Sequence, residues 1–169
     1  MRPTSILILT AAAVLAGACG LLLGTLLTSY GQPLPLPGWL PGVMLLLLTA
    51  GLLYWGLMLR RYLEESEERA EKQITAPRRH DLDMTTAFRI VILARAASWT
   101  GTLVAGFFGG ELLFLILNGS GTLIGAIAPT AFSTLTALAL CVAGVVVERW
   151  GMLPPPGGDE EAAQAEASG

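Results

Sequence analysis

Few side chains in this sequence could do chemistry, and the most unusual are Arg95 and Glu111, which both lie within long apolar stretches. An ionisable group at such depth is costly in lipid and is a candidate for binding an ion or a substrate. At 100° per residue the two side chains lie about 160° apart on one helix and roughly 24 Å apart along it, so they cannot pair. Glu111 is expected near the outer surface, within reach of the headgroups. Structural and functional roles stay open for both.

Arg89 lies at the start of the apolar stretch that contains Arg95. It is expected to reach the headgroups from the edge of the membrane. Arg95 lies about 9 Å deeper, on the side of the helix that carries Ser98 and Thr102. We therefore expect its side chain to point towards a packed helix interface rather than lipid. Trp99 could supply a cation–π contact to it.

The cysteines and the histidine do not suggest a disulfide, a metal site or a catalytic site. Cys19 and Cys141 would lie roughly 14 Å apart along the membrane normal, beyond the Cα limit of about 7 Å for a disulfide. Both thiols are expected to be packing residues. His80 has no second histidine, and the sequence shows no metal-ligand spacing, serine–histidine–acid set, paired carboxylates or phosphate loop. We expect no enzyme, no cofactor and no metal site.

These residues must be positioned by membrane helices. The chain is 53% hydrophobic and only 14% charged, and residues 3–59 and 112–147 contain no charged residue. Because about 20 apolar residues cross the hydrocarbon core, the pattern predicts an all-α domain over residues 1–153. Its four spans are 5–28, 40–59, 88–117 and 122–147, with a charged cytoplasmic loop at 60–86. Residues 154–169 are predicted to be a disordered acidic tail. The net charge of −3 argues against a nucleic-acid partner.

The stretch VLAGACGLLLG, residues 14–24, resembles the end of a lipoprotein signal that leads to Cys19. A signal peptide has an apolar region of about 7–15 residues that ends at its cleavage site. Here the apolar run continues past Cys19 to about 23 residues, and Ala16 stands where a lipoprotein signal normally has leucine. An uncleaved membrane helix is therefore the preferred interpretation.

The basic residues predict the orientation. Six lie in the long second loop, Arg2 lies at the N-terminus, and Arg149 follows the last span. The first and third loops have no charge. Since arginine and lysine collect in cytoplasmic loops, we expect both termini in the cytoplasm and a plasma (inner) membrane location.

Small residues four apart predict how the helices pack, because close approach of backbones is what holds helices together in lipid. Such stripes occur in the first and third spans, and a shorter one in the fourth. Their members are Ala12, Ala16, Gly20, Gly24 and Thr28, then Ala97, Gly101, Ala105 and Gly109, then Ser133, Ala137 and Cys141. The second span has no comparable stripe and is expected to be the most exposed to lipid. The stripes could join helices of one chain or of a homo-oligomer.

Several short motifs resemble the DUF3180 family of uncharacterised four-span membrane proteins of actinobacteria. They are RPT before the first span, Ala87-Phe88-Arg89, Leu93-Ala94-Arg95-Ala96 followed by Gly101 and Gly106, and Glu148-Arg149-Trp150. The resemblance covers roughly residues 1–155. It implies a plasma-membrane location and no known activity, with Arg89, Arg95, Glu148 and Arg149 as matching polar positions of unknown role.

Taken together, the residues favour an accessory or scaffold protein that acts through helix association. Its partners would be the lipid bilayer and either a second copy or another membrane protein. We further expect Glu148 to form an ion pair with Arg95 or Arg89 between the third and fourth spans. The alternative is a subunit of a small solute or ion transporter that uses Arg95 or Glu111.

Overall fold

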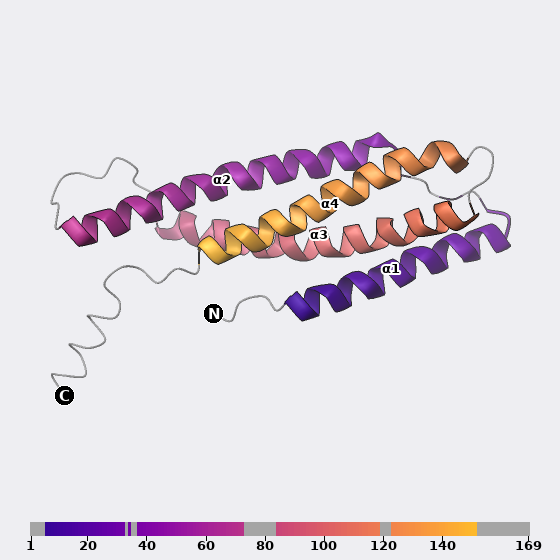
Figure 1. The fold of residues 1–169 in the computed structure, drawn as a ribbon, viewed down its shortest axis with the longest axis horizontal. Coiled ribbons are helices and arrows are strands. Elements are labelled where there is room, and N and C mark those ends of the chain that lie inside the picture. Colours follow the sequence, from indigo (N-terminus) through magenta and orange to yellow (C-terminus); the bar gives the residue numbers. More distant parts are fainter. Residues whose placement is uncertain (1–5, 33, 35–36, 73–83, 119–122, 152–169) are drawn as a thin grey trace, which may run out of the picture.

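Four long helices make up the part of the chain that the structure describes, which in this computed structural model is residues 6–32, 34, 37–72, 84–118 and 123–151. They are α1 (Ile6–Ser29), α2 (Trp39–Lys72), α3 (Met84–Asn118) and α4 (Ile124–Trp150) (Figure 1). A helix satisfies its backbone hydrogen bonds within one segment, as a stretch surrounded by lipid must. All four are long and apolar enough to cross a membrane, so the chain is an all-α, multi-pass membrane protein.

The spans of the structure are 6–29, 39–61, 88–118 and 124–150, which lie within three residues of the predicted ones at every end. α2 continues beyond its span to Lys72, so the first part of the predicted charged loop is helical. α4 stays helical through Pro129. The predicted acidic tail and residues 73–83 of the charged loop lie outside the described residues.

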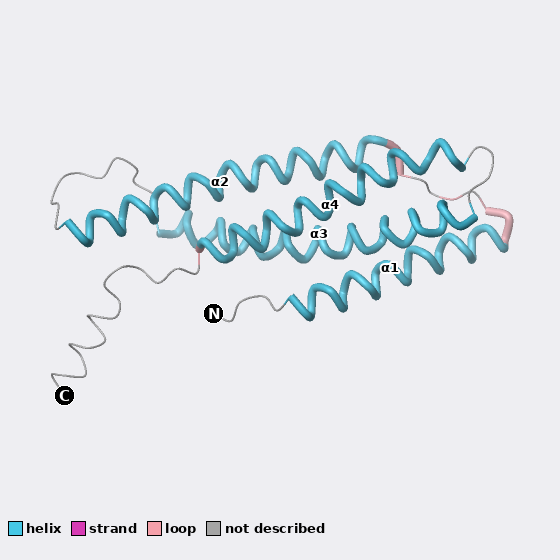
Figure 2. Tube along the Cα trace, in the orientation of Figure 1, coloured by secondary structure: helices cyan, strands magenta, loops and turns pink. Residues whose placement is uncertain are grey.

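The helices are arranged in the order α1, α3, α4, α2, so that α3 and α4 are central and the first two helices of the chain lie at the edges (Figures 1 and 2). α1 packs mainly on α3, and α2 packs mainly on α4. Each of these pairs is parallel, whereas α3 and α4 are antiparallel. α1 begins and α4 ends at the same end of the molecule.

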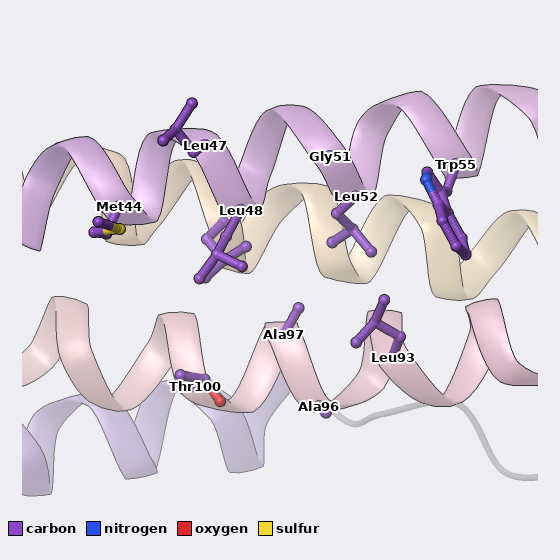
Figure 3. Close-up of a pocket in the computed structure, with 11 residues that line it drawn as sticks. Met44, Leu47, Leu48, Gly51, Leu52, Trp55, Leu93, Ala96, Ala97 and Thr100 are labelled. Atoms are coloured by element: carbon purple, nitrogen blue, oxygen red, sulfur yellow. The ribbon is translucent and has the colours of Figure 1, made fainter.

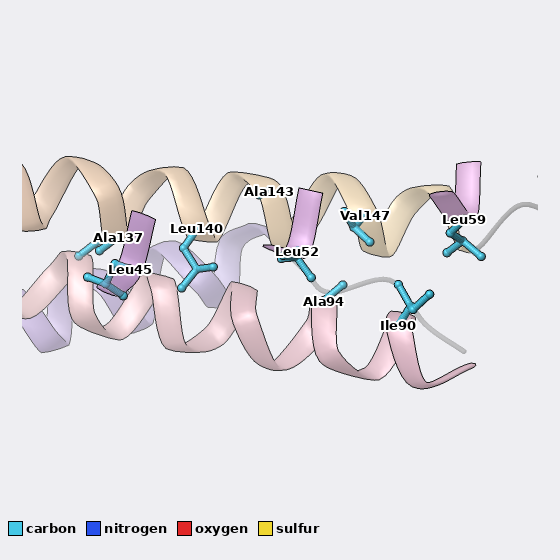
Figure 4. Packing of buried hydrophobic residues seen from close by; sticks show 10 residues of the cluster. Leu45, Leu52, Leu59, Ile90, Ala94, Ala137, Leu140, Ala143 and Val147 are labelled. Carbon is cyan, nitrogen blue, oxygen red and sulfur yellow. The ribbon is translucent and has the colours of Figure 1, made fainter. Parts of the chain in front are cut away.

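The apolar core lies between α2, α3 and α4 (Figure 4). Its least exposed members are Leu59, Ile90, Ala94, Ala137 and Val147. The expectation that the second span is the most lipid-exposed is wrong: 33% of its apolar window is buried, against 11% for α1. The reason is that α2 packs along α4 through a residue pattern that a search for stripes four apart does not detect.

The end of α1 is fixed by Gly31, whose φ of 63° lies in the left-handed region. The Gly31 N–H donates to the Thr28 carbonyl, and the Gln32 N–H donates to that of Leu27. This pair of bonds is a Schellman motif, which satisfies carbonyls at the last turn of a helix. The chain thus leaves α1 at a defined residue before it turns towards α2.

Candidate functional site

α1 and α3 pack through glycines on both helices. A Cβ added at Gly20 would collide with the carbonyl oxygen of Phe107, and one added at Gly110 would collide with that of Gly17. The other close approaches bring Gly24 against the Phe114 ring and Gly106 against Ala13 and Ala16. Ala16, Gly20 and Gly24 of the predicted stripe therefore lie at this interface, which we call the α1–α3 seam. Thr28 of the same stripe is exposed.

α3 and α4 form a second interface of the same kind, the α3–α4 seam. A Cβ at Gly101 would lie 2.5 Å from the Cys141 backbone nitrogen and 2.9 Å from the Ala137 carbonyl oxygen. Ala105 is buried, but Gly109 has only an ordinary contact, 3.9 Å from Thr134 Cγ2. The stripe predicted in the third span thus faces α4. Gly106 and Gly110, which stand directly beside it in the sequence, face α1.

The α2–α4 seam was not predicted. Six buried residues of α2 recur with the three-then-four spacing of a heptad repeat, and small residues alternate with leucine. They are Gly42, Leu45, Thr49, Leu52, Gly56 and Leu59. A Cβ at Gly42 would collide with the Phe132 ring of α4, and one at Gly56 with the Val147 side chain. Counting residues at a seven-residue period would have revealed this face.

Glu111 is a buried residue of α3 that lies beside α1. Its side chain is 2% exposed, and Oε2 has no hydrogen-bond partner. A Cβ at Gly20 would lie 3.3 Å from the Glu111 backbone nitrogen, and Gly20 is only about 4 Å past the midpoint of α1. Glu111 therefore lies among the packed helices beside α1. It stands seven residues before the end of α3 at Asn118, and its position near the outer surface stays a prediction.

A second buried polar atom without a partner is Ser133 Oγ on α4. Its buried neighbours along the helix satisfy their hydroxyls on their own backbone, as is usual in membrane helices. Thr130 Oγ1 donates to the Ala126 carbonyl at 2.8 Å, and Thr136 Oγ1 donates to that of Phe132 at 3.0 Å. Ser133 is thus an exception among its neighbours.

Between α3 and α4, Thr102 Oγ1 lies 3.1 Å from Cys141 Sγ, and the same hydroxyl donates to the Ser98 carbonyl at 2.7 Å. Cys141 is therefore a packing residue of the α3–α4 seam. Cys19 is exposed on α1, and both thiols are free. α1 runs through Cys19 without a break, in line with the interpretation as a membrane helix.

Arg95 does not face a packed interface. Its side chain is exposed, although Ser98 and Thr102 are buried. Gly106 packs on Ala13, so the parallel α1 would have to extend to about residue 2 to reach the level of Arg95, and the described helix begins at Ile6. No described helix covers that side of α3 there, and no cation–π contact to Trp99 forms.

The remaining polar positions lie where α3 begins and α4 ends. Glu148 is 3% exposed, whereas Arg89 and Arg149 are exposed. Glu148 interacts with another residue, but neither Arg89 nor Arg95 is its partner, so the expected ion pair is wrong. A contact between helices at this end was also not predicted from the sequence: the Arg60 guanidinium of α2 lies 5.3 Å from the Trp150 ring centroid of α4.

A groove of about 550 Å³ separates α2 from α3 (Figure 3). It exists because both helices pack on α4 but hardly touch each other. Its walls are almost entirely apolar and include neither Arg95 nor Glu111. Within the described residues, no group of three histidine, cysteine or acidic side chains could hold a metal ion.

Comparison with known proteins supplies a family and no activity. No curated protein and no solved structure matches the chain. The model of one family, described as a protein of unknown function, DUF3180, matches residues 9–155. That range includes almost all of the four helices, with the three seams and every polar position described above. The chain belongs to the DUF3180 family.

Proposed function

We propose that this protein is an accessory or scaffold component of the plasma membrane that binds a transmembrane helix of another membrane protein along α1. The observation that carries the proposal is the exposure of α1, which packs mainly on α3 and has 11% of its apolar window buried. An edge helix that is so little covered offers most of its surface to a neighbour. The proposal includes no catalytic step.

The exposed face of α1 has a pattern that this molecule already uses for packing. Along that face, leucine alternates with a small residue at four-then-three spacing: Ala11, Leu15, Ala18, Leu22 and Thr25. α2 buries the same alternation of leucine and small residues against α4. Because small residues let helices approach closely and leucines fill the space beside them, this face suits a second helix.

The test is photocrosslinking in native membranes with a benzophenone amino acid at Ala18. The matched control carries it at Leu135, an exposed leucine of α4 that belongs to no such face. We expect a discrete adduct with a second membrane protein at Ala18 and none at Leu135, with the partner identified by mass spectrometry. An adduct of two copies of this chain would replace the proposed partner by a homo-oligomer. Equal labelling of lipid at both positions would contradict the proposal.

The orientation belongs to the same proposal. Arg60, Arg61, Arg89 and Arg149 lie at the end of the helices where α1 begins and α4 ends. By the preference of basic residues for the cytoplasm, we infer that this end and both termini are cytoplasmic. A partner helix along α1 would then cross the membrane beside the first span.

A second candidate function is a subunit of a small solute or ion transporter, and the observation that favours it is the unpartnered Oε2 of Glu111. A buried carboxyl at membrane depth can bind a proton or a cation. Arg95 has no part in it, because its side chain is exposed on the surface of α3. Proton flux into liposomes that contain the purified protein tests the idea. Flux that Glu111→Gln abolishes would support transport, and a rate equal to that of empty liposomes would exclude proton transport.

A further inference from the structure

The groove between α2 and α3 lies within the membrane spans and leads towards a cation. Its α3 wall contains Leu93, Ala96 and Thr100. Arg89 precedes these residues by four, seven and eleven positions, which places it on the same face of the helix, one turn closer to the basic end. Its side chain is exposed and has no ion pair among the described residues. An apolar groove therefore ends beside an accessible guanidinium.

The length of the groove matches one leaflet of a bilayer. From Arg89 to Thr100 the helix rises about 16 Å, close to half of a hydrocarbon core of about 30 Å, so groove and arginine together span one leaflet. The groove has a volume of about 550 Å³, and its walls are almost entirely apolar, as the binding of an acyl chain requires. Leu140 of α4 forms part of its floor, and Trp55 of α2 points into it (Figure 3).

We propose that this groove binds an anionic phospholipid, with one acyl chain between α2 and α3 and the headgroup phosphate on Arg89. The guanidinium presents parallel N–H donors to phosphate oxygens, which suits this anion better than a point charge does. The acyl chain replaces the contacts that α2 and α3 do not make with each other. This site is on the side of α3 that faces α2, and it is independent of the helix partner proposed for α1.

The groove can be filled without disturbing the fold. A Cβ at Gly51, in the α2 wall, would meet no atom within 4 Å. Gly51→Leu should therefore occupy the groove while the backbone stays in place. Gly125→Leu is the matched control, because Gly125 is equally open but does not line the groove. For the charge, Arg89→Gln is compared with Arg95→Gln, since Arg95 is exposed but lies about 160° from Leu93 around α3.

The experiment uses the full chain in phosphatidylcholine nanodiscs, with Trp55 as the one tryptophan after Trp39→Phe, Trp99→Phe and Trp150→Phe. Brominated phosphatidylglycerol and brominated phosphatidylcholine are compared as quenchers at equal mole fractions. Since a basic residue near the membrane surface contributes enough attraction for about a fivefold preference, we expect the anionic lipid to quench about five times more effectively. Arg89→Gln should remove the preference, and Arg95→Gln should keep it. Inorganic phosphate should not compete, because it has no acyl chain.

Gly51→Leu should abolish the preference, and Gly125→Leu should leave it unchanged. Helical content by circular dichroism shows that each variant is folded. Equal quenching by the two lipids in the parent protein would overturn the proposal, as would a preference that survives Gly51→Leu. Light scattering in detergent serves as a second measurement. If Gly51→Leu converts a dimer to a monomer, the groove holds a second copy of the chain and the lipid proposal is wrong.

Discussion

Glu111 and Glu148 are buried to almost the same degree, but their surroundings differ. Glu111 Oε2 has no hydrogen-bond partner, whereas Glu148 is engaged with another residue. A buried polar atom without a partner costs about 1–3 kcal/mol, and an apolar side chain of similar shape avoids that cost. The two positions therefore predict opposite responses to the same substitution.

We expect Glu111→Met to raise the free energy of unfolding by about 1 kcal/mol, because methionine keeps the volume and removes the unpartnered oxygen. Glu148→Met should lower it, because the residue that interacts with Glu148 would lose its partner. Unfolding in mixed detergent micelles, followed by circular dichroism, measures both changes. A loss of stability at Glu111 as large as that at Glu148 would mean that Glu111 has a structural partner.

Gly101 is a position where the backbones of α3 and α4 approach very closely. Because an added methyl group would lie 2.5 Å from a backbone atom of α4, Gly101→Ala must push the two helices apart. We expect the free energy of unfolding to fall by about 1–3 kcal/mol. Gly125→Ala is the control, since its Cβ would enter open space, and it should leave stability equal or slightly higher. Equal effects at the two glycines would show that helix propensity, rather than close packing, decides the result.

At the scale of the helices, packing rather than hydropathy determines the environment of each leucine in α2. Leucines on the heptad face, which runs from Gly42 to Leu59, are buried against α4. Leu59 is 2% exposed and Leu57 is 47% exposed, although both belong to the same apolar run. Leu59→Ala should lower the free energy of unfolding by about 2 kcal/mol through the cavity it leaves. Leu57→Ala should have little effect, because it exchanges one lipid contact for another. The same unfolding assay distinguishes them, and similar losses would place α2 in a different rotation.

The sequence was sufficient to predict the helices, because the helix is the one conformation of low free energy for a long apolar run in lipid. It was also sufficient for the glycines of α1 and α3, whose spacing of four is visible without a structure. It was not sufficient for α2, whose small residues stand seven apart between leucines. Arg95 was misplaced for a related reason. Its surroundings depend on which helix lies beside α3 and at what height, and neither can be read from α3 alone.

At the scale of the whole molecule, the helices that form the centre differ from those that offer surfaces for binding. α3 and α4 are held together by their own seam and provide a fixed centre, and each carries one parallel helix on its outer side. Since α1 contacts mainly one neighbour and α2 leaves a groove beside α3, the edges are where other molecules can bind. The proposed helix partner along α1 and the proposed lipid between α2 and α3 therefore occupy different sides of the α3–α4 pair.

The side of the termini and the leaflet of the proposed lipid depend on the orientation of the molecule, which labelling in intact cells can measure. In a background with Cys19→Ala and Cys141→Ala, one variant carries Gln32→Cys, an exposed position between α1 and α2. A second carries a cysteine added after Gly169. Because the basic residues favour the cytoplasmic side, a maleimide that cannot cross the membrane should label the first variant in intact cells and the second only after lysis. The reverse pattern would show that the molecule has the opposite orientation. The Arg89 end of the groove would then lie in the outer leaflet.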